Sequence, residues 1–358
     1  MRKTSFQIPR MPKPAGHLGV FAAAIMSTVP LWSGNGFAQS PAALYPSGSQ
    51  RSNQSNDGSS SREAREAAIQ RIPFQQLTPE ATSRLRSVTE NASYFRRMPS
   101  EVVDCDQEMF AFLVRHPEVI VNIWDVMGVT KVSLKRTGPF QLRGNDGAGT
   151  SSNMDLVFGN DSMHIYFANG SYQGNLWPRE LTGRCVVVLH NRPSPLVGNK
   201  QGMTTSMDIF MKLENVGADL VVKTLGPLVG KTADYNFSEC ASFFSQISRT
   251  AEQNPYGMLQ LAKRLNNIDP KVRDQFVSTT QSVAKRGGAL TTNLSNNPAL
   301  VAKQASEEPI PEFTLGPRVP PPDSLSTRRV LESRNETEEE RVDSPTILLI
   351  GKEEKNKN

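Results

Sequence analysis

Apolar and polar residues follow two successive patterns along the middle of the chain. Between residues 130 and 213, apolar side chains fall in six short runs joined by turns rich in Gly, Asn and Asp. Five runs alternate with period two, which predicts an antiparallel meander with one apolar face. From Ala218 to Ala251 the apolar spacing changes to three and four, which predicts one long amphipathic α-helix. The runs are 130–136, 140–143, 154–158, 163–167, 184–191 and 206–213, of which 184–191 is apolar almost throughout.

The long helix carries signals at both ends and one interruption. Asp219 lies in the first turn, where a carboxylate suits the positive end of the helix dipole. Asn254-Pro255-Tyr256-Gly257 is a stop signal. Gly226-Pro227 should kink or split the helix, because proline lacks the backbone donor. The apolar stripe consists of Leu225, Val229, Ala233, Phe237, Cys240, Phe244, Ile247 and Ala251.

Shorter elements precede the strands. Residues 62–97 are predicted to form a helical N-terminal extension in two pieces around Ile72-Pro73, and Thr78-Pro79-Glu80 marks the second start. Residues 100–105 are a strand candidate. Two short helices follow, the first over 107–115 and the second ending at Gly128.

This order of elements predicts an α+β fold, in which a curved antiparallel sheet is covered by the long helix. It resembles the helix-grip fold of the START-like superfamily (SRPBCC or Bet v 1-like proteins) over residues 98–265. The closing run Leu225-Gly226-Pro227-Leu228-Val229-Gly230, with Asn236-Phe237 and Phe243-Phe244 after it, is similar to the final helix of such domains. The resemblance implies a sheet of about seven strands wrapped on a long C-terminal helix. It also implies an apolar cavity for a lipid, sterol, polyketide or other hydrophobic molecule.

The inward faces of these elements give the candidate binding residues. A cavity wall and a solid core require the same apolar side chains, and apolar stripes more often mean core packing. Both interpretations therefore stay open. The candidates are Trp124, Met127, Leu134, Leu142, Leu156, Phe158, Ile165, Phe167, Ile209, Met211, Phe237, Cys240 and Phe244.

The N-terminus has the order of an export signal. Four basic residues precede an apolar run from Leu18 to Trp32, and Gly36-Phe37-Ala38 gives a small-x-small cleavage pattern. We expect a cleaved signal over 1–38 and an exported protein, periplasmic or secreted. The alternative is an uncleaved N-terminal membrane anchor. No other stretch is long and apolar enough to span a bilayer.

Removing the signal changes the charge balance. The full chain has a net charge of +5, and 1–38 contains four of its basic residues and no acidic one, which leaves +1. A near-neutral chain without a basic stripe lacks the footprint of a nucleic-acid binder.

The remaining segments lie outside the expected domain. Residues 39–61 read as a disordered linker, 266–286 as an additional helix, and 287–358 as a polar, proline-rich disordered tail. Thr346-Ile347-Leu348-Leu349-Ile350 is a short apolar β-former within that tail. Such a segment could add to the edge of a sheet or be bound by a protein partner, or it could occur by chance.

Few residues offer chemistry. His116 is expected at a surface or cap, His164 to point away from the core, and His190 to end a strand; no pair has metal-ligand spacing. The sequence therefore predicts no cofactor, no metal and no catalytic set. Four carboxylates, Asp155, Asp208, Glu214 and Glu239, are expected to be solvated. Cys105, Cys185 and Cys240 are expected to be buried small hydrophobes, with one disulfide plus a free thiol as the alternative.

Two functional classes follow from this. The first is a noncatalytic carrier or sensor of a lipid-like molecule, and the second is an interaction or envelope-associated scaffold with a solid core that makes contacts through its tails. A START-like enzyme ranks last. A pocket of about 300 Å³ or more between helix and sheet favours the carrier.

Overall fold

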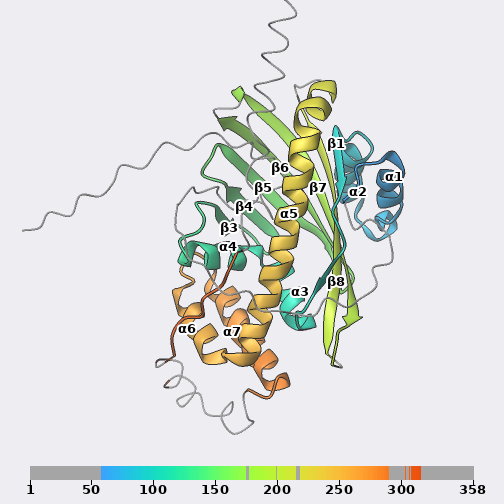
Figure 1. Ribbon diagram of the computed structural model, residues 1–358. Coiled ribbons are helices and arrows are strands. Elements are labelled where there is room, and N and C mark those ends of the chain that lie inside the picture. Colours follow the sequence, from blue (N-terminus) through green and yellow to red (C-terminus); the bar gives the residue numbers. More distant parts are fainter. Residues whose placement is uncertain are drawn as a thin grey trace, which may run out of the picture. The chain divides into compact units, whose positions relative to one another are not determined.

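The computed structural model in Figure 1 describes residues 58–174, 177–198, 200–214 and 218–289, together with 303, 306 and 308–315. Within these ranges, the side chains of 174–179, 218–229 and 231 are not described. All of these residues belong to the unit formed by 1–317. The predicted signal peptide, most of the linker, and Thr346–Ile350 lie outside the described residues.

An eight-stranded antiparallel sheet is the centre of the fold. Its strands run in the order β1-β8-β7-β6-β5-β4-β3, and β2 pairs with another part of β8. Each strand from β3 to β8 pairs with its neighbour in sequence, so the predicted meander is confirmed. The strands are β1 (Tyr94–Arg97), β2 (Glu101–Val103), β3 (Ser133–Arg136), β4 (Gln141–Asn145), β5 (Thr150–Gly159), β6 (Met163–Gly174), β7 (Trp177–Pro195) and β8 (Gln201–Leu213).

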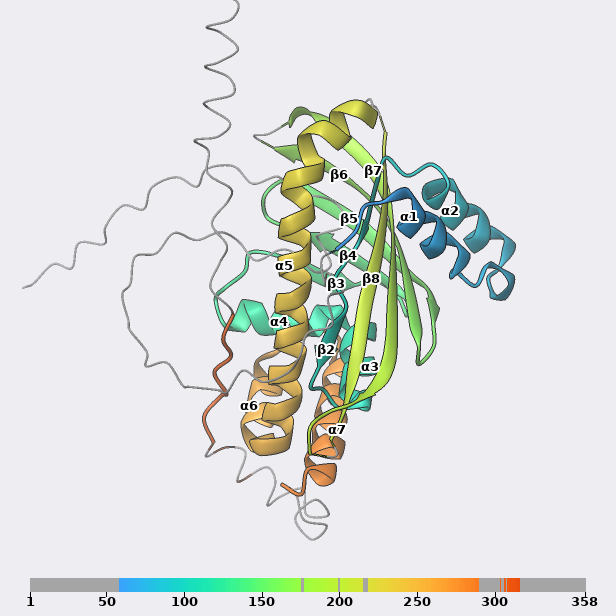
Figure 2. The same ribbon diagram turned by 45° about the vertical axis from the view of Figure 1, so that its right-hand side comes forward.

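The helices lie on both faces of this sheet. In Figures 1 and 2, α5 runs along one face, and α1 and α2 lie on the other. The helices α3, α4, α6 and α7 gather around the C-terminal half of α5. The helices are α1 (Arg62–Gln70), α2 (Pro79–Thr89), α3 (Gln107–Arg115), α4 (Pro117–Val126), α5 (Ala218–Gln253), α6 (Pro255–Arg264) and α7 (Pro270–Arg286), with a 3-10 turn η2 at Phe74–Gln76.

Local sequence signals explain most helix limits. The hydroxyl of Ser61 accepts from the backbone amide of Ala64, and that of Thr78 accepts from Ala81, so these residues cap α1 and α2. Gly128 has a φ of 70°, which ends the turn after α4 in the left-handed region that glycine favours. The order of helices and strands confirms the α+β class and the long helix that follows the strands.

The long helix differs from its expected form in two respects. It continues through Gly226-Pro227 as a single helix of 36 residues, so of the expected kink or split the split does not occur. Its first turns bend away from the axis of the rest in both views, which is the change of direction that proline causes. An unexpected helix, α6, also follows it directly, because Asn254-Pro255 both stops α5 and caps α6, whereas α7 corresponds to the additional helix predicted over 266–286.

Two apolar clusters hold the layers together. The larger lies between the sheet and α3 to α7, and includes Phe237, Phe243 and Phe244 of α5. The smaller joins the opposite sheet face to α1 and α2, and includes Ile165, Phe167 and Phe210. Because both faces are covered, the central strands carry apolar residues on both sides.

Three predicted boundaries need correction. Residues 62–97 are not wholly helical, because Tyr94–Arg97 forms β1 and pairs with β8. The expected domain end at 265 falls between α6 and α7, and α7 packs against α5 within the same core. The expected disordered tail includes residues 308–315, which lie against α5 through the buried side chain of Phe313.

Candidate functional site

The space between α5 and the sheet is the first place to look for a binding site. Next to α4 it contains a cavity of about 20 Å³ with almost entirely apolar walls. That volume holds about one water molecule and is far below the roughly 300 Å³ of a small-molecule pocket. The lining residues are Leu113, Val114, Pro117, Ile120 and Trp124 from α3 and α4, Tyr166, Val187, Leu189 and Met207 from the sheet, and Cys240 and Phe244 from α5.

Aromatic rings fill much of the volume around this cavity. Trp124 lies 5.7 Å from Phe243 between ring centroids, and Phe110 meets Phe244 edge-on at 5.5 Å. Such tilted and edge-to-face arrangements are the favourable ones for aromatic pairs. The part of the interior that the structure describes is therefore a packed core.

Ten of the thirteen candidate binding residues lie on the α5 side of the sheet. Three of them, Trp124, Cys240 and Phe244, line the small cavity. Met127 and Leu156 are partly buried against the same core. The others in this core are Leu134, Leu142, Ile209, Met211 and Phe237.

The remaining three candidates, Phe158, Ile165 and Phe167, lie on the opposite face, against α1 and α2. The β5–β6 register shifts between Leu156 and Phe158, so these two residues do not share a face as simple alternation predicts. On β6 both faces are apolar, and Tyr166, Ala168 and Tyr172 belong to the core on the α5 side. The sequence predicts helices within 62–97, but no local pattern shows that they cover this face of the sheet and make Ile165 and Phe167 core residues.

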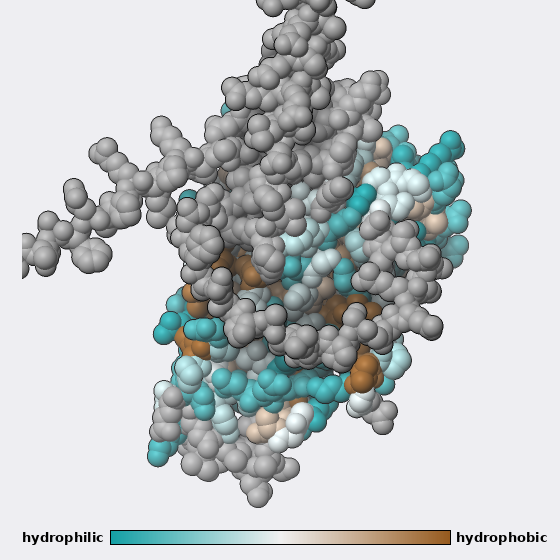
Figure 3. All heavy atoms as spheres, in the orientation of Figure 1, coloured by the Kyte–Doolittle hydropathy of each residue, from teal (hydrophilic) through white to brown (hydrophobic). Residues whose placement is uncertain are grey.

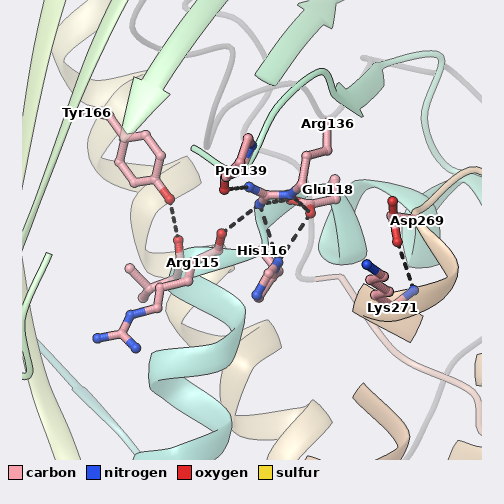
Figure 4. A network of polar contacts seen from close by, with 9 residues as sticks. Arg115, His116, Glu118, Arg136, Pro139, Tyr166, Asp269 and Lys271 are labelled. Atoms are coloured by element: carbon pink, nitrogen blue, oxygen red, sulfur yellow. Dashed lines mark hydrogen bonds and ion pairs between the residues drawn. The ribbon is translucent and has the colours of Figure 1, made fainter. Parts of the chain in front are cut away.

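A buried ion pair fastens α4 to β3 beside this core (Figure 4). Glu118 is 1% exposed and accepts from Arg136 Nε at 2.6 Å and Nη2 at 3.0 Å. Arg136 also donates to the backbone carbonyls of Pro139 and Arg115. Burial opposes ionisation of Glu118, but hydrogen bonds from His116 and Arg136 and the Arg136 charge outweigh it, so the pKa of Glu118 is lowered. A carboxylate held in this way stabilises the fold and is a poor proton donor.

His164 is also buried, contrary to the expectation that it points away from the core. Its Nε2 accepts from Arg115 Nε at 3.2 Å, and its Nδ1 lies 3.4 Å from the amide of Asn191. Burial, together with the Arg115 charge, lowers the pKa of His164 to about 4. The ring is therefore neutral near pH 7 and belongs to the contact between α3 and the sheet.

Three carboxylates expected to be solvated are paired. Asp208 is 1% exposed and bonds to Arg71 Nη2 at 2.6 Å and Arg97 Nε at 2.7 Å, with His190 Nε2 at 3.4 Å. Asp155 pairs with Arg84, and Glu214 lies 2.9 Å from Arg184. The expectation was wrong because the two arginines of Asp208 are more than 100 residues away in sequence, and no local pattern marks them. His190 lies within β7 and does not end it.

The cysteines match the expectation of buried hydrophobes. Cys105, Cys185 and Cys240 form no disulfide and are buried. Burial raises the pKa of each thiol, that of Cys240 to about 12, which keeps them protonated and unreactive at neutral pH. In the described part of the chain, no three His, Cys, Asp or Glu side chains come together as a metal site.

Two hydroxyls on the α5 side of the sheet are buried. Thr150 and Ser152 of β5 are 2% and 4% exposed, and neither hydroxyl has a hydrogen-bond partner among the described residues. Both lie on the same face as Met154 of the core, and Ser152 pairs across the sheet with Gly144 and Gly170. Neither neighbour carries a side chain, and at Gly144 an added Cβ would meet Met154, the Ser152 hydroxyl and Leu134 within 3.4 Å.

The surface on the α5 side is polar over the lower helices, and hydrophobic residues reach it in small patches (Figure 3). Of the described residues, the large exposed hydrophobic ones are Val102, Phe140 and Val197, which come from three separate parts of the chain. Among the described helices, none combines the length and apolar character that crossing a bilayer requires.

No protein-family model and no curated protein matches this sequence. Solved structures give partial similarity at 10% identity. A conserved protein from Geobacillus kaustophilus matches with a TM-score of 0.27, over 40% of this chain and 91% of its own. An uncharacterised protein from Rhizobium leguminosarum matches with a TM-score of 0.26, over 40% of this chain and 93% of its own. These similarities carry no argument about family or function.

Proposed function

We propose that this protein is an exported, noncatalytic interaction module, in which a START-like sheet grips α5 around a solid core and partners bind at the surface. The observation that carries the proposal is the interior volume of about 20 Å³ beside α4 and α5. A core filled by Trp124, Phe243 and Phe244 leaves the outside of the domain and the chain ends to make contacts. Export rests on the charge and apolar pattern of residues 1–38.

The charge pairs favour the same proposal. Glu118 and Asp208 are buried carboxylates with depressed pKa values and arginine partners, which suits rigid fastening of layers. Catalytic acids and bases need a pKa near the working pH and access to substrate. Neither carboxylate meets the first condition.

A fluorescence titration with the apolar dye N-phenylnaphthylamine tests the proposal. We expect the folded full-length chain to give no saturable rise in dye emission, because the core that the described residues form leaves only about 20 Å³ beside α4, too little for a bicyclic ring. Saturable binding of one dye per chain that a long-chain fatty acid displaces would contradict the solid core.

A second candidate function is a carrier of an apolar molecule with a polar head, and the unpaired hydroxyls of Thr150 and Ser152 favour it. A buried hydroxyl without a partner costs roughly 1–3 kcal/mol, which a ligand could relieve. In a carrier, Gly170→Leu should abolish dye binding, because residue 170 is the cross-strand partner of Ser152 and the new side chain lies on the same face of the sheet. Gln141→Leu is the matched control, because Gln141 is exposed and alternates with the core residue Leu142, which places it on the opposite side of the sheet.

A further inference from the structure

A short segment from the C-terminal part of the chain lies on α5 in an extended form. In Pro309–Leu315, the side chain of Phe313 is 8% exposed and meets Phe243 edge-on at 5.4 Å. Ile310 and Leu315 pack partly buried against the same core, whereas Glu312 and Thr314 are exposed. The segment therefore inserts one aromatic anchor and two flanking apolar residues.

Gln246 of α5 recognises the backbone of this segment. Its Oε1 accepts from the amide of Thr314 at 2.9 Å, and its Nε2 donates to the carbonyl of Thr314 at 2.7 Å. A side-chain amide that pairs with both backbone groups of one residue imitates a strand partner. The Thr314 hydroxyl also donates to Gln246 Oε1 at 3.3 Å, so the pairing fixes an extended peptide through its backbone and adds one side-chain hydrogen bond at that position.

Gly257 of α6 makes room for the segment. A Cβ at this position would lie 2.8 Å from the carbonyl oxygen of Pro309, closer than real Cβ contacts allow. Three residues thus form this surface. Phe243 contacts the aromatic ring of the segment, Gln246 hydrogen-bonds to its backbone, and Gly257 lets its backbone approach α6 closely. Selection comes from the phenylalanine, since only its side chain is buried within the segment.

The contacts that hold this segment all involve side chains of the segment or of α5. Within 308–315, no backbone group bonds to another backbone group among the described residues. A ligand tethered in the same chain is favoured by an effective concentration that is roughly millimolar for a short linker. Occupancy by the protein's own segment therefore does not require high intrinsic affinity.

We propose that this surface of α5 and α6 is a binding site for extended protein segments that carry a phenylalanine, and that Pro309–Leu315 is an internal occupant that a partner's segment displaces. The inference rests on the proposed interaction function and names its partner class: an extended peptide with one buried Phe and apolar residues three positions before and two after it.

The test uses a fluorescein-labelled peptide with the sequence of residues 308–316 and measures its anisotropy against the full-length chain. We expect the Phe313→Ala chain to bind the peptide saturably and the unaltered chain at least about tenfold more weakly, since its own segment competes. A peptide with Ala in place of Phe should not bind. Adding Gln246→Ala to the Phe313→Ala chain should weaken binding by roughly tenfold, because the two backbone hydrogen bonds are lost.

Thr314→Pro is a second way to free the site, because it removes the amide that Gln246 Oε1 accepts and leaves Phe313 in place. It replaces Phe313→Ala if that variant loses its circular dichroism spectrum. Folded variants that bind the peptide no better than the unaltered chain overturn the inference. If neither the dye nor the peptide binds, the peptide-site inference is wrong and the proposed function with a solid core stands. Saturable dye binding without peptide binding contradicts the proposed function as well.

Discussion

Replacing Asp208 with Asn should lower the free energy of unfolding by about 1–3 kcal/mol, because charged hydrogen bonds are lost while the two arginines left behind, Arg71 and Arg97, are 44% and 27% exposed and stay partly hydrated. The carboxylate is 1% exposed and shared by Arg71 and Arg97, so its loss leaves two guanidinium groups without a counter-charge. These arginines come from the end of α1 and from β1, so the expected result is loosening of the N-terminal layer. Urea unfolding followed by circular dichroism measures it.

Asp155→Asn is the matched control. Asp155 pairs with Arg84 on the same sheet face, but both side chains are about one-third exposed. An exposed pair contributes about 0–1 kcal/mol, so this variant should unfold close to the unaltered chain. Equal effects of the two substitutions would show that burial of Asp208 has no energetic consequence.

The pH dependence of the Asp208 effect has a definite sign. Burial raises its pKa, but hydrogen bonds from His190 and Arg97 and the charges of both arginines outweigh it, so the pKa is lowered below 3.8. The stabilisation is therefore present at neutral pH and is lost as the pH falls below about 4 through the folded-state pKa. The difference between Asp208→Asn and the unaltered chain should shrink over this acid range.

Replacing Phe244 with Ala should destabilise the protein by about 3–5 kcal/mol, the usual cost of deleting a core phenylalanine. Phe244 is buried, packs edge-on against Phe110, and borders the small cavity between α4 and the sheet. Truncation would enlarge a cavity that has no room to collapse without moving α3. The midpoint and slope of urea unfolding give the value.

Phe140→Ala is the control for this variant, because Phe140 is 58% exposed in the turn before β4. It should change stability by no more than about 0.5 kcal/mol. A loss below about 1 kcal/mol for Phe244→Ala would contradict a filled core, since a side chain at the wall of an open cavity has fewer contacts to lose.

Elements with strong local signals were predictable from sequence. The limits of α3 follow from Asp106, whose side chain caps Glu108 and Met109, and from the break at His116-Pro117. The meander followed from period-two alternation over β3 to β8, because each strand pairs with its neighbour in sequence. The start of α5 at Ala218 also agrees with the apolar spacing.

Elements that depend on distant partners were not predictable. Residues 94–97 form β1 because they pair with the edge of β8. Four residues are too few to show a period-two alternation of apolar and polar side chains. Asp208 pairs with two arginines, and Phe313 packs on α5. Each of these contacts joins residues more than 60 apart in sequence. For the candidate site, the apolar pattern correctly identified residues of the core. The same pattern is expected of residues that line a ligand cavity and of residues that fill a solid core. Only the volume of the cavity distinguishes these two cases.

The most direct test of the solid core is the native mass spectrum of the full-length chain, purified from its expressing cells without detergent or organic solvent. The account predicts the mass of the polypeptide alone, with no adduct that disappears on denaturation. A stoichiometric lipid-sized adduct that denaturation releases would contradict it and establish the space between α5 and the sheet as a ligand site.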